Sequence, residues 1–304
     1  MTTPLIGAIE AGGTKFVIAI ARADGTILEQ ARLDTESPAI TMPGVLAFFR
    51  EAAARHGPIG GLGIGSFGPV DIDRASPTYG SITSTPKPHW SGASYLEWLA
   101  PLQVPMLVDT DVNAAALGEW QAGAGQGTGT LAYTTVGTGV GTGLVRRGEP
   151  VGGFTHFESG HIRPRHDHAR DPFAGTCPYH GDCLEGLASG PAIKARYGQS
   201  LDQMADTADA VELLGDYLSD LALSLILLHA PDRLIFGGGV MKAPGLLDSL
   251  RLQTERKLAG YVVHPRLDPG LQRYIVGPGL GDLAGITGAI ALGRQAMAAP
   301  RAGA

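Results

Sequence analysis

Segments rich in Ile, Val and Ala at the start of the chain predict three β-strands, over residues 5–10, 15–21 and 27–34. The tetrapeptide Ala11-Gly12-Gly13-Thr14 separates the first two strands. Asp24-Gly25, which is typical of a hairpin turn, separates the second and third. We therefore expect the chain to open as a meander of three strands.

Apolar positions then take helical spacing over residues 43–55, and a glycine-rich strand over 61–66 runs into a turn that contains Gly68. Such turns at the carboxyl ends of strands are where open α/β sheets bind ligands. Residues 73–92 lack periodicity and are rich in Pro, Ser, Thr and Gly, which predicts a long irregular loop. Long ordered loops are commonly functional, so Lys87 and His89 in this loop are candidate ligand contacts.

A short helix at 95–99 and a strand at 105–109 lead to an alanine-rich helix that begins near Asp111. The Asp111 carboxylate therefore follows the end of a strand and lies near the amides of a helix N-terminus, which favour its ionised form. Considered without its neighbours, an Asp in this place is as readily a helix cap as a functional group.

The opening pattern returns in the middle of the chain, where strands at 130–136 and 140–145 flank Gly137-Thr138-Gly139. This duplication indicates two related domains that each present a glycine turn to a cleft. The second half then predicts a helix with the buried stripe Val211, Leu214, Leu218, Leu221, Leu225 and Leu228, a strand at 233–236, a helix at 246–259, a strand at 273–276 and a last helix at 283–299.

Composition narrows the class of protein. The 304 residues suffice for two domains, and the net charge of −6 gives no basic surface for nucleic acid. The N-terminal segment lacks the basic start and apolar run of a signal peptide, so we expect a cytoplasmic protein. Residues 121–145 carry no charge, but eight of them are glycine, which argues against a membrane helix.

Both cysteines lie in the segment Cys177-Pro-Tyr-His180-Gly-Asp-Cys183, whose spacing lets one tight turn aim two thiolates and an imidazole at a common point. We expect a structural zinc with His161 as its fourth ligand, and His168 is the main alternative. A disulfide between the cysteines is the competing interpretation, and a reducing compartment disfavours it.

An acid stands at each end of this segment, since Glu158 lies three residues before His161 and Glu185 lies two residues after Cys183. A metal that ties the ends together would hold two carboxylates near each other. Such a pair suits a polar ligand.

The two glycine turns present backbone amides and hydroxyls without bulky side chains, which suits phosphate oxygens. One such turn alone is more often a plain β-turn. A third turn at residues 237–239, after a buried strand, favours nucleotide binding. Neither the Rossmann fingerprint nor the P-loop is present, so a different nucleotide fold is expected.

Six short motifs occur along the chain, and their order is informative about the type of protein. They are Glu10-Ala-Gly-Gly-Thr-Lys15, Asp111-Val-Asn-Ala-Ala-Ala-Leu-Gly-Glu119, Thr135-Val-Gly-Thr-Gly-Val-Gly141, Glu158-Ser-Gly-His161, the cysteine segment with Glu185, and Phe236-Gly-Gly-Gly239. Together they resemble the ROK family of bacterial sugar kinases over residues 6–282. The resemblance implies an actin-like, ribonuclease H-like ATPase fold, with two α/β domains and a cleft between them for ATP and sugar.

The cysteine segment and the Thr-Pro-Lys-Pro loop at Thr85 are most similar to the fructokinase branch, which implies conversion of D-fructose to D-fructose 6-phosphate with ATP and Mg²⁺. By this resemblance Asp111 is the general base, and the sugar contacts are Glu158, His161 and Glu185. Gly68 in the strand-end turn and Lys87 in the irregular loop are predicted as further sugar contacts. Phosphates would be held by Gly12, Gly13, Thr14, Lys15, Thr138 and Gly139, and adenosine would lie by Gly238 and Gly239. The zinc ligands would be His161, Cys177, His180 and Cys183.

The implied domains are residues 1–111 with the last helix, 283–304, packing back on them, and residues 112–282. Two residues depart from the family pattern, which often has Asp where this chain has Glu10 and Asn where it has Thr110. We expect a homodimer, since the apolar helices beyond Leu201 can supply a dimer face.

Other interpretations remain open at this point. Glucose, mannose and N-acetylhexosamines differ from fructose by features that no motif distinguishes, and a non-catalytic sugar sensor would carry the same motifs. A repressor of the same fold would need a helix-turn-helix before Glu10, where only nine residues stand. A zinc hydrolase would need an open metal position, which two thiolates and two histidines do not leave.

Overall fold

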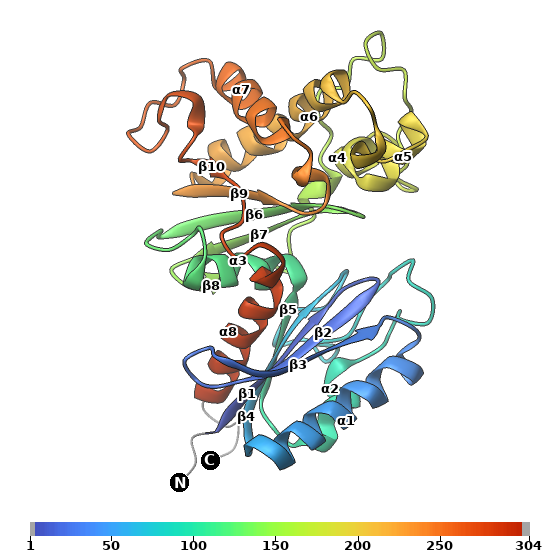
Figure 1. Cartoon of the computed structure of the whole chain (residues 1–304), viewed down its shortest axis with the longest axis vertical. Helices are drawn as coiled ribbons and strands as arrows, with labels where there is room; N and C mark the ends of the chain where they lie inside the picture. Colours follow the sequence, from blue (N-terminus) through green and yellow to red (C-terminus); the bar gives the residue numbers. More distant parts are fainter. Residues whose placement is uncertain (1–3, 300–304) are drawn as a thin grey trace. The chain divides into compact units, whose positions relative to one another are not determined.

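The computed structural model describes residues 4–299, which form two units (Figure 1). The first contains the chain up to Gly123, the segment Pro150–His156 and the residues from Asp282 onward. The second contains Ala124–Glu149 and Phe157–Gly281. Each unit is built on a five-stranded mixed sheet with helices, so the predicted α/β class is confirmed.

The sheet of the first unit has the order β3-β2-β1-β4-β5. Its antiparallel half is the predicted meander of β1 (Leu5–Ala11), β2 (Lys15–Ala21) and β3 (Ile27–Asp34). The strands β4 (Ile59–Ser66) and β5 (Met106–Thr110) continue the sheet on the other side of β1 as parallel neighbours.

Alternation along the strands decides which helix covers which face of this sheet. Ile9 and Ile18 belong to a core that includes α1 (Pro38–His56), whereas Ile6 and Ala8 pack with α8 (Ala284–Ala298). In its described residues the first unit has two more α-helices. The short α2 (Tyr95–Leu99) contributes to the same core as α1, and α3 (Asp111–Ala122) packs against α8.

The helices α3 and α8 approach each other closely because glycines line their contact. A Cβ added at Gly288 would collide with the carbonyl oxygen of Ala114, and one at Gly118 would collide with that of Ala284. Because α3 packs against α8, the first unit includes all of α3 and ends at Gly123 in this part of the chain. The predicted boundary between the two domains after residue 111 stays a prediction.

The predicted start of the first long helix at residue 43 is wrong, because α1 begins at Pro38 and contains Pro43. Pro38 takes the first helical position, where a proline is tolerated because the backbone N–H groups there have no intrahelical partner, whereas Pro43 lies inside the helix. The amides of Ile40 and Thr41 already close the first turn on the Ser37 carbonyl, at 3.0 and 2.9 Å.

The sheet of the second unit has the order β10-β9-β6-β7-β8. It consists of β6 (Thr130–Val136), β7 (Val140–Arg146), β8 (Glu149–Pro150), β9 (Arg233–Gly237) and β10 (Ile275–Val276). A hairpin pairs with one edge of the central β6, and parallel strands continue from its other edge. The first sheet has the same arrangement around β1, which confirms the duplication predicted from the two glycine turns.

The helices of the second unit are α4 (Leu184–Ala188), α5 (Gly190–Tyr197), α6 (Ala208–His229) and α7 (Leu246–Leu258). In α6 the predicted stripe is buried at Leu214, Leu218, Leu221 and Leu225. Leu228 is 77 % exposed, so its assignment to the core is wrong. It lies in the last turn of the helix, past the end of the surface that the helix covers.

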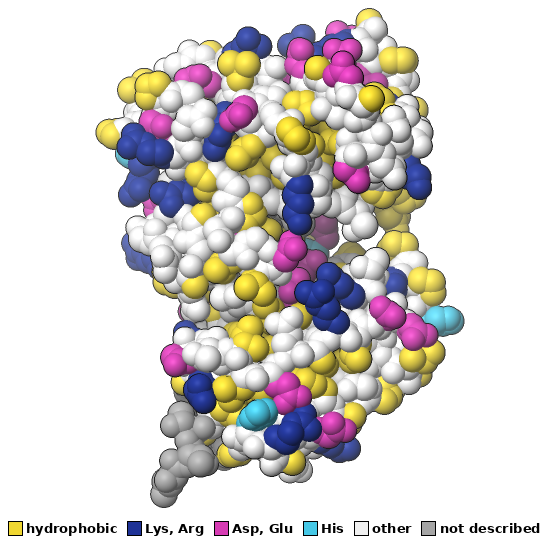
Figure 2. Space-filling view, in the orientation of Figure 1, with side chains coloured by type: hydrophobic (Ala, Val, Ile, Leu, Met, Phe, Trp, Pro, Cys, Tyr) yellow, Lys and Arg dark blue, Asp and Glu magenta, His cyan; other side chains and the backbone are white. Residues whose placement is uncertain are grey.

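Charged side chains of both signs occur on the visible face of both units (Figure 2). Among residues 4–299, none of the helices is both long enough and apolar enough to cross a bilayer.

Candidate active site and metal centre

The turn between β1 and β2 presents backbone groups at the surface. The Gly12 amide donates to the Lys15 carbonyl at 3.0 Å, while a Cβ at Gly13 would meet no atom within 4 Å. Thr35 anchors the turn from the inside, because its hydroxyl donates to the Gly12 carbonyl at 2.7 Å and its amide donates to the Thr14 carbonyl at 3.0 Å. An anchored glycine turn with an open outer side is suited to an anion such as phosphate.

Lys87 reaches this same turn. Its ammonium group donates to the Gly13 carbonyl at 2.6 Å. The loop that carries Lys87 is irregular, as predicted, and it is fixed by buried Trp90, whose indole N–H donates to the Glu36 carbonyl at 2.6 Å. Lys87, expected at the sugar, thus lies beside the turn expected to hold phosphate.

Asp111 is the first residue of α3 and directly follows β5. The helix is capped by Thr110, which is 3 % exposed and whose hydroxyl accepts the Asn113 amide at 3.1 Å. The interpretation of Asp111 as the helix cap is therefore wrong. Its Oδ1 accepts the adjacent Val112 amide at 2.8 Å, and the helix does not need its carboxylate in order to begin.

A second acid braces the start of α3. Asp109 Oδ1 accepts the Thr110 amide and the Asn113 side-chain amide, each at 2.7 Å. Burial raises the pKa of Asp109, although these two hydrogen bonds oppose the change. The sequence analysis did not single out Asp109, yet the spacing of Asp109 and Asn113, four residues apart across a strand–helix junction, was a usable signal.

Glu10 projects from β1 toward the start of α8. Gly285 makes room for it, since a Cβ there would lie 2.5 Å from the Glu10 carboxyl carbon. Burial raises the pKa of Glu10, and nearby Lys15 only partly opposes this. Within the described part of the chain, its Oε2 atom is buried and has no hydrogen-bond partner.

Gly68 lies in a turn with a cis peptide bond to Pro69. The Val70 amide in this turn donates to His156 Nε2 at 3.3 Å, and His156 is only 8 % exposed. Because Nε2 accepts, the ring proton is on Nδ1 in this hydrogen-bond network. Sequence reasoning missed His156, which comes from the distant segment Pro150–His156 and belongs to no recognisable motif.

In the second unit, the turn between β6 and β7 lies against Glu185. The Glu185 Oε2 atom accepts the Val140 amide at 2.9 Å, and a Cβ at Gly139 would lie 2.7 Å from the same oxygen. Gly137 closes the turn with a bond to the Gly139 carbonyl at 2.8 Å, and Thr138 between them is exposed. The structure thus brings an expected sugar contact, Glu185, to an expected phosphate turn.

The two glycines that follow β9, Gly238 and Gly239, differ in how much space surrounds them. Gly238 has a φ of +93°, and a Cβ there would collide with the backbone of Val136, so only glycine fits. A Cβ at Gly239 would meet nothing within 4 Å. The backbone at Gly239 is therefore approachable by a flat or bulky ligand.

Four side chains of the second unit converge as a metal site would require. The ligand atoms of His161, Cys177, His180 and Cys183 all lie within 4.8 Å of one another. The sulfur of Cys177 lies 3.8 Å from His161 Nδ1 and 3.6 Å from His180 Nδ1, and the sulfur of Cys183 lies 3.5 Å from His161 Nδ1. Sulfur and nitrogen ligands of one tetrahedral zinc are about 3.6 Å apart, so the residues fit this ion.

The Cys183 thiol needs a cation in order to ionise. Burial, reinforced by the neighbouring Cys177, raises the pKa of Cys183 to about 11. Both cysteines are free, which rules out the disulfide interpretation. His168 lies instead with His166 and Asp182, so His161 is the histidine that completes the four-residue group.

Glu158 leads into the single turn Ser159–His161, where its carbonyl accepts the His161 amide at 3.0 Å. Its side chain is exposed. His161 directs Nδ1 toward the two sulfurs, which leaves Nε2 on the opposite side of the ring.

Comparisons with known proteins agree with this arrangement. The sequence matches the ROK family over residues 6–296. It is 42 % identical to a putative fructokinase of Bacillus subtilis, with 98 % of each chain covered, and 43 % identical to a fructokinase of Zymomonas mobilis, with 95 % of this chain and 96 % of that protein covered. A ROK family glucokinase from Streptomyces griseus, solved with glucose and AMPPNP, superposes with a TM-score of 0.71 at 26 % identity and covers 96 % of this chain and 99 % of its own.

Proposed function

Because this chain belongs to the ROK family and is a sugar kinase, we propose that it transfers the γ-phosphoryl group of ATP to the 6-hydroxyl of D-fructose. The observation that carries the choice of sugar is the identity of 42 to 43 % with two proteins named as fructokinases over nearly the whole chain. The fold is the actin-like ATPase fold of the ROK structures.

Asp111 is the proposed general base. Phosphoryl transfer depends on positioning and charge neutralisation, with a carboxylate that accepts the proton of the attacking hydroxyl. Since Thr110 already caps α3, the Asp111 carboxylate is not needed as the helix cap. The proton would pass from the sugar hydroxyl to a carboxylate oxygen of Asp111 as the new P–O bond forms.

The two glycine turns are the proposed phosphate sites, with Gly12, Gly13, Thr14 and Lys15 in one and Thr138 and Gly139 in the other. Their support is the anchored backbone and the open space at Gly13. Lys87 adds a positive charge at the first turn. Gly238 and Gly239 are the proposed adenosine side, where Gly239 leaves room for a ligand.

Glu10 is the proposed acid for Mg²⁺, which neutralises phosphate charge during transfer. Its buried and unpartnered Oε2 fits this role, because a magnesium-bound water would satisfy that oxygen. The longer side chain of Glu10, compared with the Asp common in the family, is accommodated by Gly285.

Zinc is the proposed metal of the second unit, held by His161, Cys177, His180 and Cys183. A closed site of this kind contributes folding energy and performs no chemistry. It would fix the segment that carries Glu158 and Glu185, the proposed sugar contacts. His161 Nε2, which faces away from the thiols, is free of the metal and suited to a sugar hydroxyl.

Gly68 remains a proposed sugar contact through its turn, which buried His156 holds in place. We also propose a homodimer. Its support is apolar surface on the second unit, where Leu228, Tyr261 and Val263 are each more than three-quarters exposed. Sedimentation equilibrium measures the assembly directly, and a monomer at micromolar concentration would contradict it.

A coupled ATP-consumption assay over fructose, glucose, mannose and N-acetylmannosamine tests the choice of sugar. We expect the highest kcat/KM with fructose. Glucose is the second candidate, because the Streptomyces griseus structure is a glucokinase. A higher kcat/KM for glucose would refute the fructose proposal and leave the kinase assignment intact, whereas no turnover with any of these sugars would favour a sensor.

A further inference from the structure

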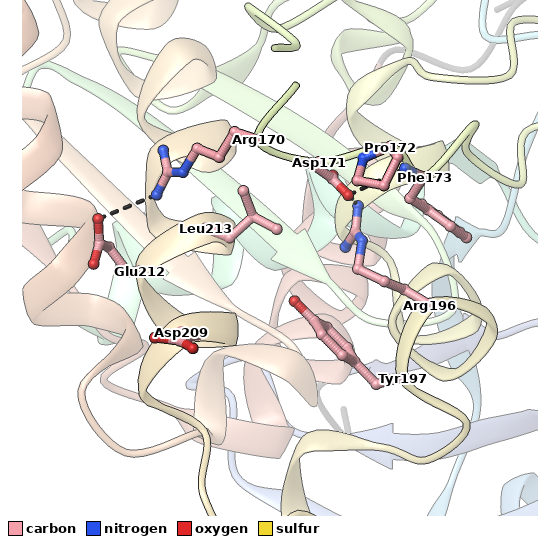
Figure 3. Close-up of a pocket in the computed structure, with 9 residues that line it drawn as sticks. All are labelled: Arg170, Asp171, Pro172, Phe173, Arg196, Tyr197, Asp209, Glu212 and Leu213. Atoms are coloured by element: carbon pink, nitrogen blue, oxygen red, sulfur yellow. Dashed lines mark hydrogen bonds and ion pairs between the residues drawn. The ribbon is translucent and has the colours of Figure 1, made fainter. Parts of the chain in front are cut away.

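The second unit contains a cavity of about 700 Å³ that the proposed reaction does not use (Figure 3). It lies beside α5 and the first turns of α6, and the segment that precedes the cysteines forms a third wall. Its lining residues are Arg170, Asp171, Pro172, Phe173, Arg196, Tyr197, Asp209, Glu212 and Leu213. None of them belongs to the glycine turns or to the metal group.

The wall formed by Arg196 is rigid. Arg196 is 7 % exposed at its side chain, and its Nη2 lies 2.9 Å from Asp171 Oδ2, which also accepts the Tyr217 hydroxyl at 2.7 Å. Its guanidinium lies over the Phe173 ring, 4.4 Å from the centroid, and its Nη1 donates to the Leu187 carbonyl of α4 at 2.9 Å. Such a fixed network is preorganised to bind a ligand without further loss of side-chain entropy.

One donor in this wall lacks an acceptor. Arg196 Nε is buried and has no hydrogen-bond partner in the described part of the chain. The Nε atom is enclosed by the protein, so a ligand in the cavity would lie against the Arg196 side chain without reaching this atom.

Other polar groups and rings face the same space. Figure 3 shows the Tyr197 hydroxyl pointing from α5 toward the side of Asp209 and Leu213. Asp209 carries an acceptor carboxylate, while Phe173 and Leu213 offer apolar surface. A compound that both donates and accepts hydrogen bonds and has an apolar ring face would match this mixture.

The charges disfavour phosphorylated ligands. Arg170 is already paired with Glu212 at 3.1 Å and with Asp216 at 3.2 Å, and Arg196 is paired with Asp171. The carboxylate of Asp209 would repel a phosphate placed beside it. The favoured ligand is therefore uncharged.

We propose that this cavity is a second carbohydrate site, which binds a neutral mono- or disaccharide. The hydroxyls of such a sugar would donate to Asp209 and exchange hydrogen bonds with Tyr197, and its ring face would lie on Phe173. The cavity volume lies within the range of about 300 to 1,000 Å³ found for small-molecule sites.

The test is the number of sugars bound per chain, measured by isothermal titration without ATP with fructose, glucose and sucrose in turn. We expect two equivalents of at least one of these sugars for the wild-type chain. Leu213→Trp, which places a larger side chain in the cavity, should reduce this to one. Asp209→Asn should weaken the second equivalent about tenfold or more, since it replaces a charged acceptor at an exposed position.

Asp202→Asn is the matched control, since Asp202 is an exposed acid of the same unit outside the cavity, and it should leave both equivalents unchanged. The proposal would be overturned if the wild type bound none of the three sugars, or if a folded Leu213→Trp variant retained every equivalent that the wild type binds. Glucose 6-phosphate binding that Leu213→Trp removes would refute the neutral-ligand assignment. Because no ATP is present, a failure of the proposed fructokinase reaction would not affect this result.

Discussion

The replacement Asp111→Asn separates two roles that one carboxylate could have at the start of α3. The Asn side chain keeps the size of Asp and still offers an Oδ1 to the Val112 amide, which lies 2.8 Å away. The cap is supplied by Thr110 and stays in place. We therefore expect the free energy of unfolding to change by no more than about 0.5 kcal/mol.

The effect on catalysis should be far larger. Removal of a general base costs about 10² to 10⁴ in rate, which corresponds to about 3 to 5 kcal/mol in transition-state free energy. The loss should fall on kcat, while the ATP dissociation constant stays near the wild-type value, since Asp111 is not part of either glycine turn.

Thr110→Ala provides the matched control at the adjacent position. It removes the hydroxyl that accepts the Asn113 amide at 3.1 Å and should cost about 0.5 to 2 kcal/mol of stability. Its kcat should stay within a small factor of wild type at a temperature where the variant is folded. Urea denaturation and steady-state kinetics with ATP and fructose measure both quantities. Wild-type kcat in a folded Asp111→Asn protein would refute the assignment of the base.

Three further outcomes are expected. Protein purified without added metal should contain one zinc per chain by elemental analysis. The Cys183→Ser variant should lose both the zinc and thermal stability. A metal-free wild type with full activity would contradict the zinc site. Burial raises the pKa of Asp109 above its ordinary 3.8, so its contribution to stability is present below pH 3.8 and is lost as the pH rises through the folded-state pKa. Asp109→Asn should therefore flatten the fall of the urea midpoint over this pH range. A variant with the same pH profile as the wild type would contradict this role of Asp109. Gly288→Ala should cost about 1 to 3 kcal/mol by forcing α8 away from α3, whereas Gly277→Ala, which meets open space, should cost little; equal urea midpoints for the two variants would refute the close-contact argument.

Local sequence patterns predicted most of the elements because strands and helices leave short-range periodicities. The meander of β1 to β3 and its repeat in β6 and β7 were readable from apolar runs and glycine turns. The start of α1 was predicted incorrectly. Pro43 suggested that the helix begins there, but Ser37 is the N-cap and Pro38 is the first helical residue. The end of α6 was also misjudged, since periodicity at Leu228 carries no information about where the covered surface stops.

The candidate site likewise contains residues that local sequence patterns predicted and residues that they did not. The convergence of the four candidate metal ligands was predictable because three of them follow a short spacing, and the structure places His161, not His168, beside the two cysteines. His156 and the partnership of Lys87 with Gly13 could not be predicted, since both depend on contacts between residues distant in sequence. The roles of the individual site residues stay predictions that the proposed variants test.

The packing of α8 also determines when the first sheet becomes complete during synthesis on the ribosome. One face of β1 and β2, with Ile6, Ala8 and Val17, is buried by α8. Translation produces these strands early and α8 only after every other described element. Until then the apolar face stays uncovered, so the unit that is translated first is completed last, while the second unit can fold beforehand from a segment already made. The nascent first sheet is thus exposed to aggregation for the time needed to translate the second unit, and chaperone protection would matter most in that interval.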